Sequence, residues 1–143
     1  MSNQDLFRKV KELNLPFGQY ALFGSAPLGI RELRECRDID LIVTEELWNE
    51  FKNKSGWEYK ITENGVEHIA KGDIEIWHDW LPWYQDISKF IKNAEIIDGL
   101  PFVRLESIIE WKKKFGREKD LKDVELMEWL KLNMDKKTIE KII

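Results

Sequence analysis

The chain has 143 residues, of which 43% are hydrophobic and 12% aromatic, enough to form one compact core. Its 23 lysines and arginines nearly balance its 27 aspartates and glutamates, so the formal net charge is −4, which excludes a polybasic nucleic-acid binder that acts mainly through counterion release. The single cysteine, Cys36, excludes a disulfide framework, and we expect one domain over residues 1–143 in a reducing, cytoplasmic setting.

The first half of the chain predicts helices that alternate with strands. The longest uncharged stretch, residues 13–30, is interrupted by prolines and glycines, so no membrane span is expected. Ser25 and Thr44 are each expected to cap the helix that follows. In chain order we expect a helix over Asp5–Leu13, a buried strand over Tyr20–Phe23, a helix from Ser25 to about Cys36, a strand over Asp38–Val43 and a helix from Glu45 to about Lys54.

The second half predicts a β-meander followed by helices. Asn64-Gly65 is a hairpin signal between two of its strands. We expect strands over Trp57–Thr62, Val66–Ala70 and Asp73–Trp77, a helix over Tyr84–Asn93, a short extended piece over Ile96–Val103, and helices over Val103–Phe115 and Glu118–Leu132. The predicted fold class is α/β or α+β, with a mixed sheet of about five strands in residues 1–100, flanking helices and a C-terminal helical segment in residues 103–143.

One constellation of residues points to chemistry. Gly24-Ser25 lies where a buried strand turns into a helix, twelve residues follow, and Asp38 and Asp40 then stand two apart on the next predicted strand. The period of two residues in a strand places both carboxylates on one face, where they repel each other unless a cation or a proton intervenes. Oxygen ligands alone favour Mg²⁺ over zinc, and a glycine at a helix start lets a phosphate approach the backbone.

This pattern, an apolar strand with Gly-Ser, a spacer of about a dozen residues and Asp-apolar-Asp, resembles the DNA-polymerase-β-like nucleotidyltransferase superfamily, particularly its small single-domain antitoxin- and toxin-type members. That superfamily carries a third carboxylate on a later strand, which completes a two-metal site. The matching residue here is Glu75 in Ile74-Glu75-Ile76, with Asp73 as a substitute on the same face. The run from Arg117 to Asp123, Arg-Glu-Lys-Asp-Leu-Lys-Asp, is similar to a run in the terminal helices of these members.

The resemblance implies a Mg²⁺-dependent transfer of a nucleoside monophosphate from an NTP to a hydroxyl acceptor, which would be a small molecule, a protein or an RNA end. It implies that Asp38, Asp40 and Glu75 hold two Mg²⁺ ions and that Gly24 and Ser25 bind the outgoing pyrophosphate. Further positive charge around the triphosphate would come from basic residues after the turn or in the C-terminal segment: Arg31, Arg34, Lys113, Lys114 or Arg117.

Other interpretations of the same residues remain open. Asp38 and Asp40 could end a solvated strand, Glu75 could be an ordinary polar residue of an exposed meander, and Ser25 could only cap a helix. The chain could then be a catalytically weak or inactive module of this fold that binds nucleotide, RNA or a protein partner in regulation. The third carboxylate separates these two classes of function.

The acceptor and the oligomeric state are not specified by any residue pattern. A cluster of aromatic residues could line an acceptor pocket, because aromatic rings stack on bases and other planar groups, or could belong to the core or to an oligomer interface. Its members are Trp77, Trp80, Trp83 and Tyr84. A homodimer and a toxin-antitoxin-type protein partner are both compatible with the sequence, and modification of a small antibiotic is a variant of the enzyme hypothesis.

Overall fold

The computed structural model describes residues 2–78, 87–115, 118, 121–122, 124–129 and 132. The chain divides into two compact units, Met1–Arg104 and Leu105–Ile143. The first unit contains α1 (Asn3–Glu12), β1 (Tyr20–Phe23), α2 (Ala26–Gly29), β2 (Ile39–Val43), α3 (Glu45–Phe51), β3 (Glu58–Ile61), β4 (Glu67–Lys71), β5 (Ile74–Trp77), α4 (Ile87–Lys92), β6 (Glu95–Ile97) and β7 (Leu100–Phe102). The second unit contains α5 (Leu105–Phe115).

The fold is α+β, with one mixed sheet of seven strands in the order β3-β4-β5-β2-β1-β7-β6. The expectation of about five strands is therefore wrong. The extended piece predicted over Ile96–Val103 forms an antiparallel hairpin of its own, β6 and β7, and β7 joins the sheet in parallel with β1. The meander β3-β4-β5 is confirmed, and β5 pairs in parallel with β2.

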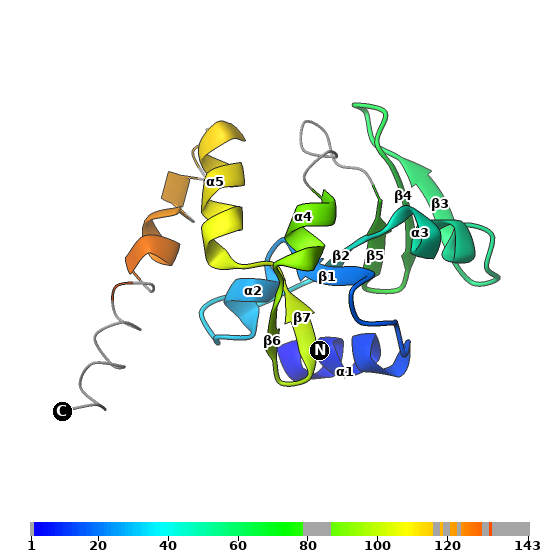
Figure 1. Ribbon diagram of the computed structural model, residues 1–143, viewed down its shortest axis with the longest axis horizontal. Helices are drawn as coiled ribbons and strands as arrows, with labels where there is room; N and C mark the ends of the chain where they lie inside the picture. Colours follow the sequence, from blue (N-terminus) through cyan, green and yellow to red (C-terminus); the bar gives the residue numbers. More distant parts are fainter. Residues whose placement is uncertain are drawn as a thin grey trace. The chain divides into compact units, whose positions relative to one another are not determined.

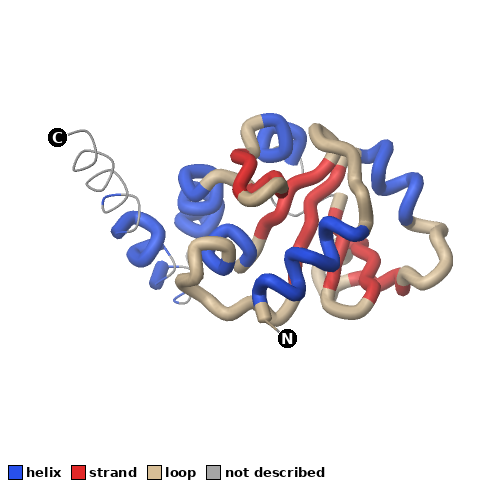
Figure 2. The backbone as a smooth tube through the Cα atoms, turned by 90° about the horizontal axis from the view of Figure 1, so that it is seen from below, coloured by secondary structure: helices blue, strands red, loops and turns tan. Residues whose placement is uncertain are grey.

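One face of the sheet is covered by α1 and α3. Successive strand side chains point to opposite faces of the sheet, and those on this face form the main core. Among them, Leu22, Leu41 and Ile76 are completely buried. Phe7 of α1 packs edge-on against Phe102 of β7, with ring centroids 5.7 Å apart. Seen from below, α1 lies in front of the strands (Figure 2). Ile39 and Leu41 belong to this core, so the layer anchors the central strands.

The opposite face of β1 and β2 is covered by α4. Phe90 of this helix stacks on Phe23 of β1 at a centroid distance of 6.3 Å, and Figure 1 shows α4 and α1 on opposite sides of the central strands. The strand residues on this side include Ile42, Asp40 and Glu75, because successive side chains alternate across a sheet. The carboxylates therefore lie on the face opposite the main core.

The helix after β1 is much shorter than predicted. It ends at Gly29 instead of near Cys36, because the hydrogen bonds after it tighten from the i+4 spacing of Ile30 to Ala26 to the i+3 spacing of Arg31 to Leu28. Ser25 occupies the N-cap position, as predicted, but its hydroxyl makes no capping hydrogen bond. Thr44, by contrast, caps α3 by accepting a hydrogen bond from the Leu47 N–H at 3.4 Å, as predicted.

The second unit is helical where the structure describes it. Within this unit, Lys113 of α5 lies 2.9 Å from the Glu128 carboxylate, an ion pair between exposed side chains. In the described part of the chain no helix is long and apolar enough to cross a membrane. Several residues of the sequence-based predictions lie outside the described residues: Arg117, Lys119, Asp120 and Asp123, together with Trp80, Trp83 and Tyr84. For Lys114 only the backbone is described.

Candidate active site

The turn after β1 brings the backbone against a carboxylate of β2. Gly24 has a φ of +64°, a conformation that glycine adopts without steric cost. A Cβ atom at this position would lie 2.5 Å from Asp40 Oδ2, because Asp40 is paired with Phe23 in the neighbouring strand. The glycine therefore lets the chain turn close to the Asp40 carboxylate.

Two neighbours fix the Asp40 side chain. Asp40 and Glu75 face each other in the β2-β5 register, so the Glu75 carboxyl group favours the protonated form of Asp40. The Trp77 indole Nε1–H donates to Asp40 Oδ1 at 3.3 Å. Burial first, and then the hydrogen bond and charge of Glu75, raise the pKa of Asp40 from 3.8 to about 8.

Asp38 stands one residue before β2 and is exposed. Partial burial raises its pKa, and the negative charges of Glu75 and Asp73 act in the same direction, while Arg37 and Lys60 oppose them. Asp38, Asp40 and Glu75 are therefore close enough for their charges to interact, and we call these three residues the acidic cluster. Such a cluster gains stability from a proton or from a cation.

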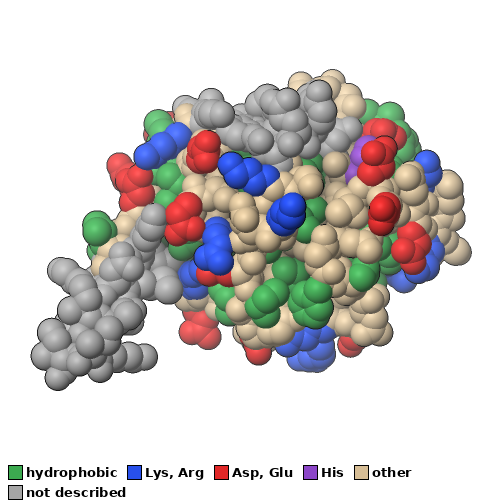
Figure 3. Space-filling model, viewed as in Figure 1, with side chains coloured by type: hydrophobic (Ala, Val, Ile, Leu, Met, Phe, Trp, Pro, Cys, Tyr) green, Lys and Arg blue, Asp and Glu red, His purple; other side chains and the backbone are tan. Residues whose placement is uncertain are grey.

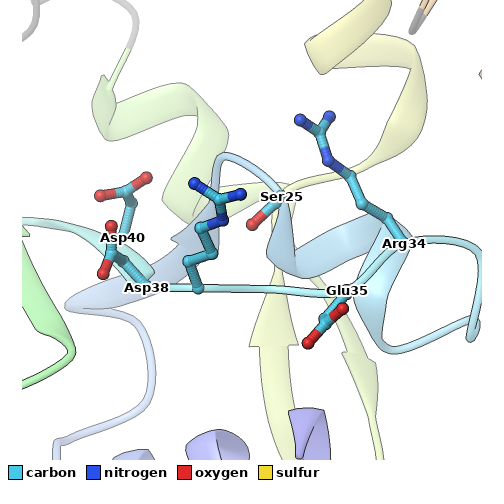
Figure 4. Close-up of a pocket in the computed structure, with 6 residues that line it drawn as sticks. Ser25, Arg34, Glu35, Asp38 and Asp40 are labelled. Atoms are coloured by element: carbon cyan, nitrogen blue, oxygen red, sulfur yellow. The ribbon is translucent and has the colours of Figure 1, made fainter.

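A pocket of about 740 Å³ opens beside this cluster. Its lining combines three carboxylates, two guanidinium groups and a hydroxyl: Ser25, Arg34, Glu35, Arg37, Asp38 and Asp40. In Figure 4, Asp38 and Asp40 lie together at one end, Ser25 lies between them and Arg34, and Glu35 points the opposite way from Arg34. The mixed charge suits a ligand that carries both anionic groups and a bound cation.

The structure separates the two arginines that the sequence placed together. Arg34 lines the pocket, whereas Arg31 donates to Glu95 Oε1 at 2.5 Å and to the Pro27 carbonyl at 2.6 Å. Its side chain is only 13% exposed in this contact. Arg31 thus ties the end of α2 to β6, and the expected triphosphate contact is not supported by its position.

Glu75 and Asp73 occupy different environments. Glu75 lies in β5 directly opposite Asp40, while Asp73 lies in the turn before β5 and forms an ion pair with Lys9 at 3.4 Å. The Asp73 carbonyl also accepts the Ile39 N–H at 2.8 Å, which fixes the start of β2 beside β5. Of the two candidates for the third carboxylate, Glu75 is the one in contact with Asp40.

The donor chemistry at this edge fits Mg²⁺, because carboxylate oxygens are its preferred protein ligands. Within the described residues, however, no group of three or more His, Cys, Asp or Glu side chains is arranged to hold a metal ion. Burial beside Glu75 raises the pKa of Asp40 instead, which favours a proton on this carboxyl group. A cation would therefore have to displace that proton and draw the side chains together.

Sequence reasoning missed three residues that the fold brings to the site. Arg37 and Glu35 line the pocket, and the position of Arg37 immediately before Asp38 was the available signal. Trp77 was considered only as part of an aromatic cluster, although the strand period places it on the same face as Glu75. Its indole also stacks on the buried His68 ring, at a centroid distance of 3.9 Å, which holds the donor toward Asp40.

The electrostatics of Asp40 predict how stability depends on pH. Its pKa of about 8 in the folded chain exceeds the ordinary 3.8, so the folded state holds a proton that the unfolded chain has released. This contribution to the free energy of unfolding is fully present below pH 3.8 and is lost as the pH rises through about 8. Urea unfolding of the metal-free protein across this range should show the loss.

The matched control for this pH effect is Asp40→Asn, which removes the titrating group. The difference in unfolding free energy between wild type and variant should decline with rising pH. A difference in unfolding free energy that stays constant, or that grows with pH, would contradict the protonation of Asp40 in the folded chain.

Comparisons of the chain with protein-family models, with curated proteins and with solved structures gave no match. On the face of the first unit that is visible in Figure 3, acidic and basic side chains are interspersed, so a focused site and not a broad charged surface is the feature to explain.

Proposed function

We propose that this protein is a Mg²⁺-dependent nucleotidyltransferase of the cytoplasm that moves a nucleoside monophosphate from an NTP to a hydroxyl acceptor. The observation that carries the proposal is one pocket lined by Asp38, Asp40, the Ser25 hydroxyl and two arginines, with Glu75 directly opposite Asp40 on the neighbouring strand. Carboxylates can hold the cation while the cationic and hydroxyl groups bind phosphate oxygens.

The acidic and the basic residues of the site have different roles in the proposed transfer. In the transfer, an acceptor hydroxyl oxygen bonds to the α-phosphorus and the bond from that phosphorus to pyrophosphate breaks. Asp38, Asp40 and Glu75 would hold Mg²⁺, which when bound neutralises phosphate charge and lowers the pKa of the attacking hydroxyl. The guanidinium groups of Arg34 and Arg37 would bind the charge of the leaving pyrophosphate.

Several groups position the reactants without touching the reacting atoms. Trp77 holds Asp40 in one orientation through its indole N–H, and Gly24 leaves the space in which the Asp40 carboxylate lies. The Ser25 hydroxyl is not used as a helix cap, which leaves it available to donate to a phosphate oxygen. Such preorganisation is the main contribution that a protein makes to phosphoryl transfer.

A catalytically inactive module that binds nucleotide is the second candidate. The raised pKa of Asp40 favours it, because burial beside Glu75 stabilises a proton on the carboxyl group that would have to hold the cation. Both candidate functions are compatible with a homodimer and with a toxin-antitoxin-type protein partner. A transfer assay in cell extract would identify the small molecule, protein or RNA end that serves as acceptor.

Glu75→Gln should abolish transfer of label from [α-³²P]NTP to cell extract in the presence of Mg²⁺, because the amide keeps the size of the side chain and removes its charge. Asp73→Asn is the matched control and should keep transfer within about threefold of wild type, because Asp73 is paired with Lys9 outside the pocket. The measurement is the initial rate with each of the four nucleotides.

Two results would count against this assignment. Wild type that transfers no label from any nucleotide favours the binding module, and loss of transfer in Asp73→Asn alone would make Asp73 the third carboxylate.

A further inference from the structure

The loop over residues 30–37, which we call the basic loop, connects α2 to β2 and carries Arg34 and Arg37 to the pocket. It is not held by regular secondary structure, and Glu32 within it has a φ of +61°. The positions of the two guanidinium groups therefore depend on whatever fixes the loop.

Asn3, at the start of α1, bonds to the basic loop and to the end of α2. Its Nδ2 donates to the Arg34 carbonyl at 2.8 Å and to the Gly29 carbonyl at 3.3 Å, and its Oδ1 accepts the Cys36 N–H at 2.8 Å. One half-buried amide thus joins the two ends of a loop that lies about thirty residues away along the sequence.

The Cys36 side chain also packs between the basic loop and α2. Its Sγ donates to the Ser25 carbonyl at 3.6 Å, and it occupies the space beside Gly29, where an added Cβ would overlap the sulfur. Cys36 is 3% exposed and is the only cysteine of the chain. Because this thiol is buried, a thiol reagent reaches it slowly unless the loop opens.

We propose that Asn3 is a positioning residue, which holds the basic loop in the conformation that presents Arg34 and Arg37 to the phosphates of the ligand. This inference rests on the proposed function, because it assigns the pocket a triphosphate. It extends the site to α1, which lies on the other side of the sheet from Asp40.

The cap of α1 does not use the Asn3 side chain. Ser2 and Asp5 form a complete capping box, in which the Ser2 hydroxyl accepts the Asp5 N–H at 3.1 Å and Asp5 accepts the Ser2 N–H at 3.1 Å. The described hydrogen bonds of the Asn3 side chain all go to the basic loop or to the end of α2. Stability of the helix and position of the loop can therefore be changed separately.

Two variants separate these roles. Asn3→Asp keeps an acceptor for the Cys36 N–H and an acid in the first turn, which favours the helix, but it loses both donors to the loop carbonyls. Ser2→Ala removes the cap and leaves the Asn3 contacts in place. The measurements are the rate at which a disulfide reagent labels Cys36 and the affinity for inorganic triphosphate by calorimetry, both well below the unfolding temperature.

We expect Asn3→Asp to label about tenfold faster and to bind triphosphate about tenfold more weakly, since each lost hydrogen bond contributes modestly to holding the loop. Ser2→Ala should unfold at a lower temperature yet match wild type in both measurements. Equal labelling rates of Cys36 in Asn3→Asp and wild type would overturn the inference. Faster labelling of Asn3→Asp with unchanged affinity for triphosphate would also overturn it, as would equal changes of labelling rate and affinity in Asn3→Asp and Ser2→Ala.

Neither measurement requires catalysis, so the two proposals fail separately. Wild type that binds triphosphate but transfers no nucleotide contradicts the enzyme and leaves the role of Asn3 to be judged by these two measurements. Wild type that does not bind triphosphate overturns the inference about Asn3, whatever the transfer assay gives.

Discussion

Asp40→Asn is expected to reduce nucleotidyl transfer by about 10³-fold while the protein stays folded. The amide has the size of the carboxylate and can still accept the Trp77 indole N–H, but it carries no charge to hold a cation. It also removes the carboxyl group that burial and Glu75 keep protonated, so folding loses no ion pair. The measurement is kcat at saturating Mg²⁺ and NTP, together with the unfolding temperature.

Asp98→Asn is the matched control for this variant. Asp98 is exposed, lies in the turn between β6 and β7 and contacts Lys11 at 3.7 Å, so its replacement should change neither kcat nor folding appreciably. Transfer at the wild-type rate by Asp40→Asn would remove Asp40 from the reaction.

The second large effect is expected for Gly24→Ala. A methyl group at this position meets Asp40 Oδ2 at 2.5 Å, and the residue must adopt a φ of +64°, so we expect a loss of about 1–3 kcal/mol in the free energy of unfolding. Displacement of the Asp40 carboxylate should also reduce transfer by about 10²-fold, because a misplacement of an ångström is costly in catalysis.

Gly72→Ala separates the two causes. Gly72 has a similar φ of +59°, and a Cβ atom added there would meet no other atom within 4 Å, so this variant carries the backbone strain without the contact. It should lose stability and keep its activity. If both variants lose activity equally, backbone strain and not the contact with Asp40 explains the effect.

The central strands could be predicted because their signals are local. The apolar run Tyr20–Phe23 and the β-branched residues before Thr44 identify β1 and β2, and Asn64-Gly65 identifies the hairpin of β3 and β4. The hairpin β6-β7 could not be counted as part of the sheet, because its strands have three residues each. Its membership depends on parallel pairing between Leu22 and Phe102, which are far apart in sequence.

The acids of the candidate site and Arg34 could be predicted, but the departure of Arg31 and the arrival of Arg37 could not. The spacing of Asp38 and Asp40 places them in one cluster with Glu75 in any strand that pairs in this order. Arg31 and Arg34 would share a face only on a continuous helix. Because α2 ends at Gly29, the two arginine side chains point to different places. The contacts of Asn3 with the basic loop determine the position of Arg34 instead.

The binding of Mg²⁺ and nucleotide at the acidic cluster is tested most directly by thermal unfolding of wild type and of Asp38→Asn/Asp40→Asn, each with Mg²⁺ and ATP, GTP, CTP or UTP. A ligand at a hundred times its Kd adds about 2.7 kcal/mol of stability, so the nucleotide-induced shift within each protein is the quantity to compare. We predict a shift that requires Mg²⁺ in wild type and is absent in the double variant. No shift of wild type with any nucleotide at millimolar concentration would contradict the proposed function.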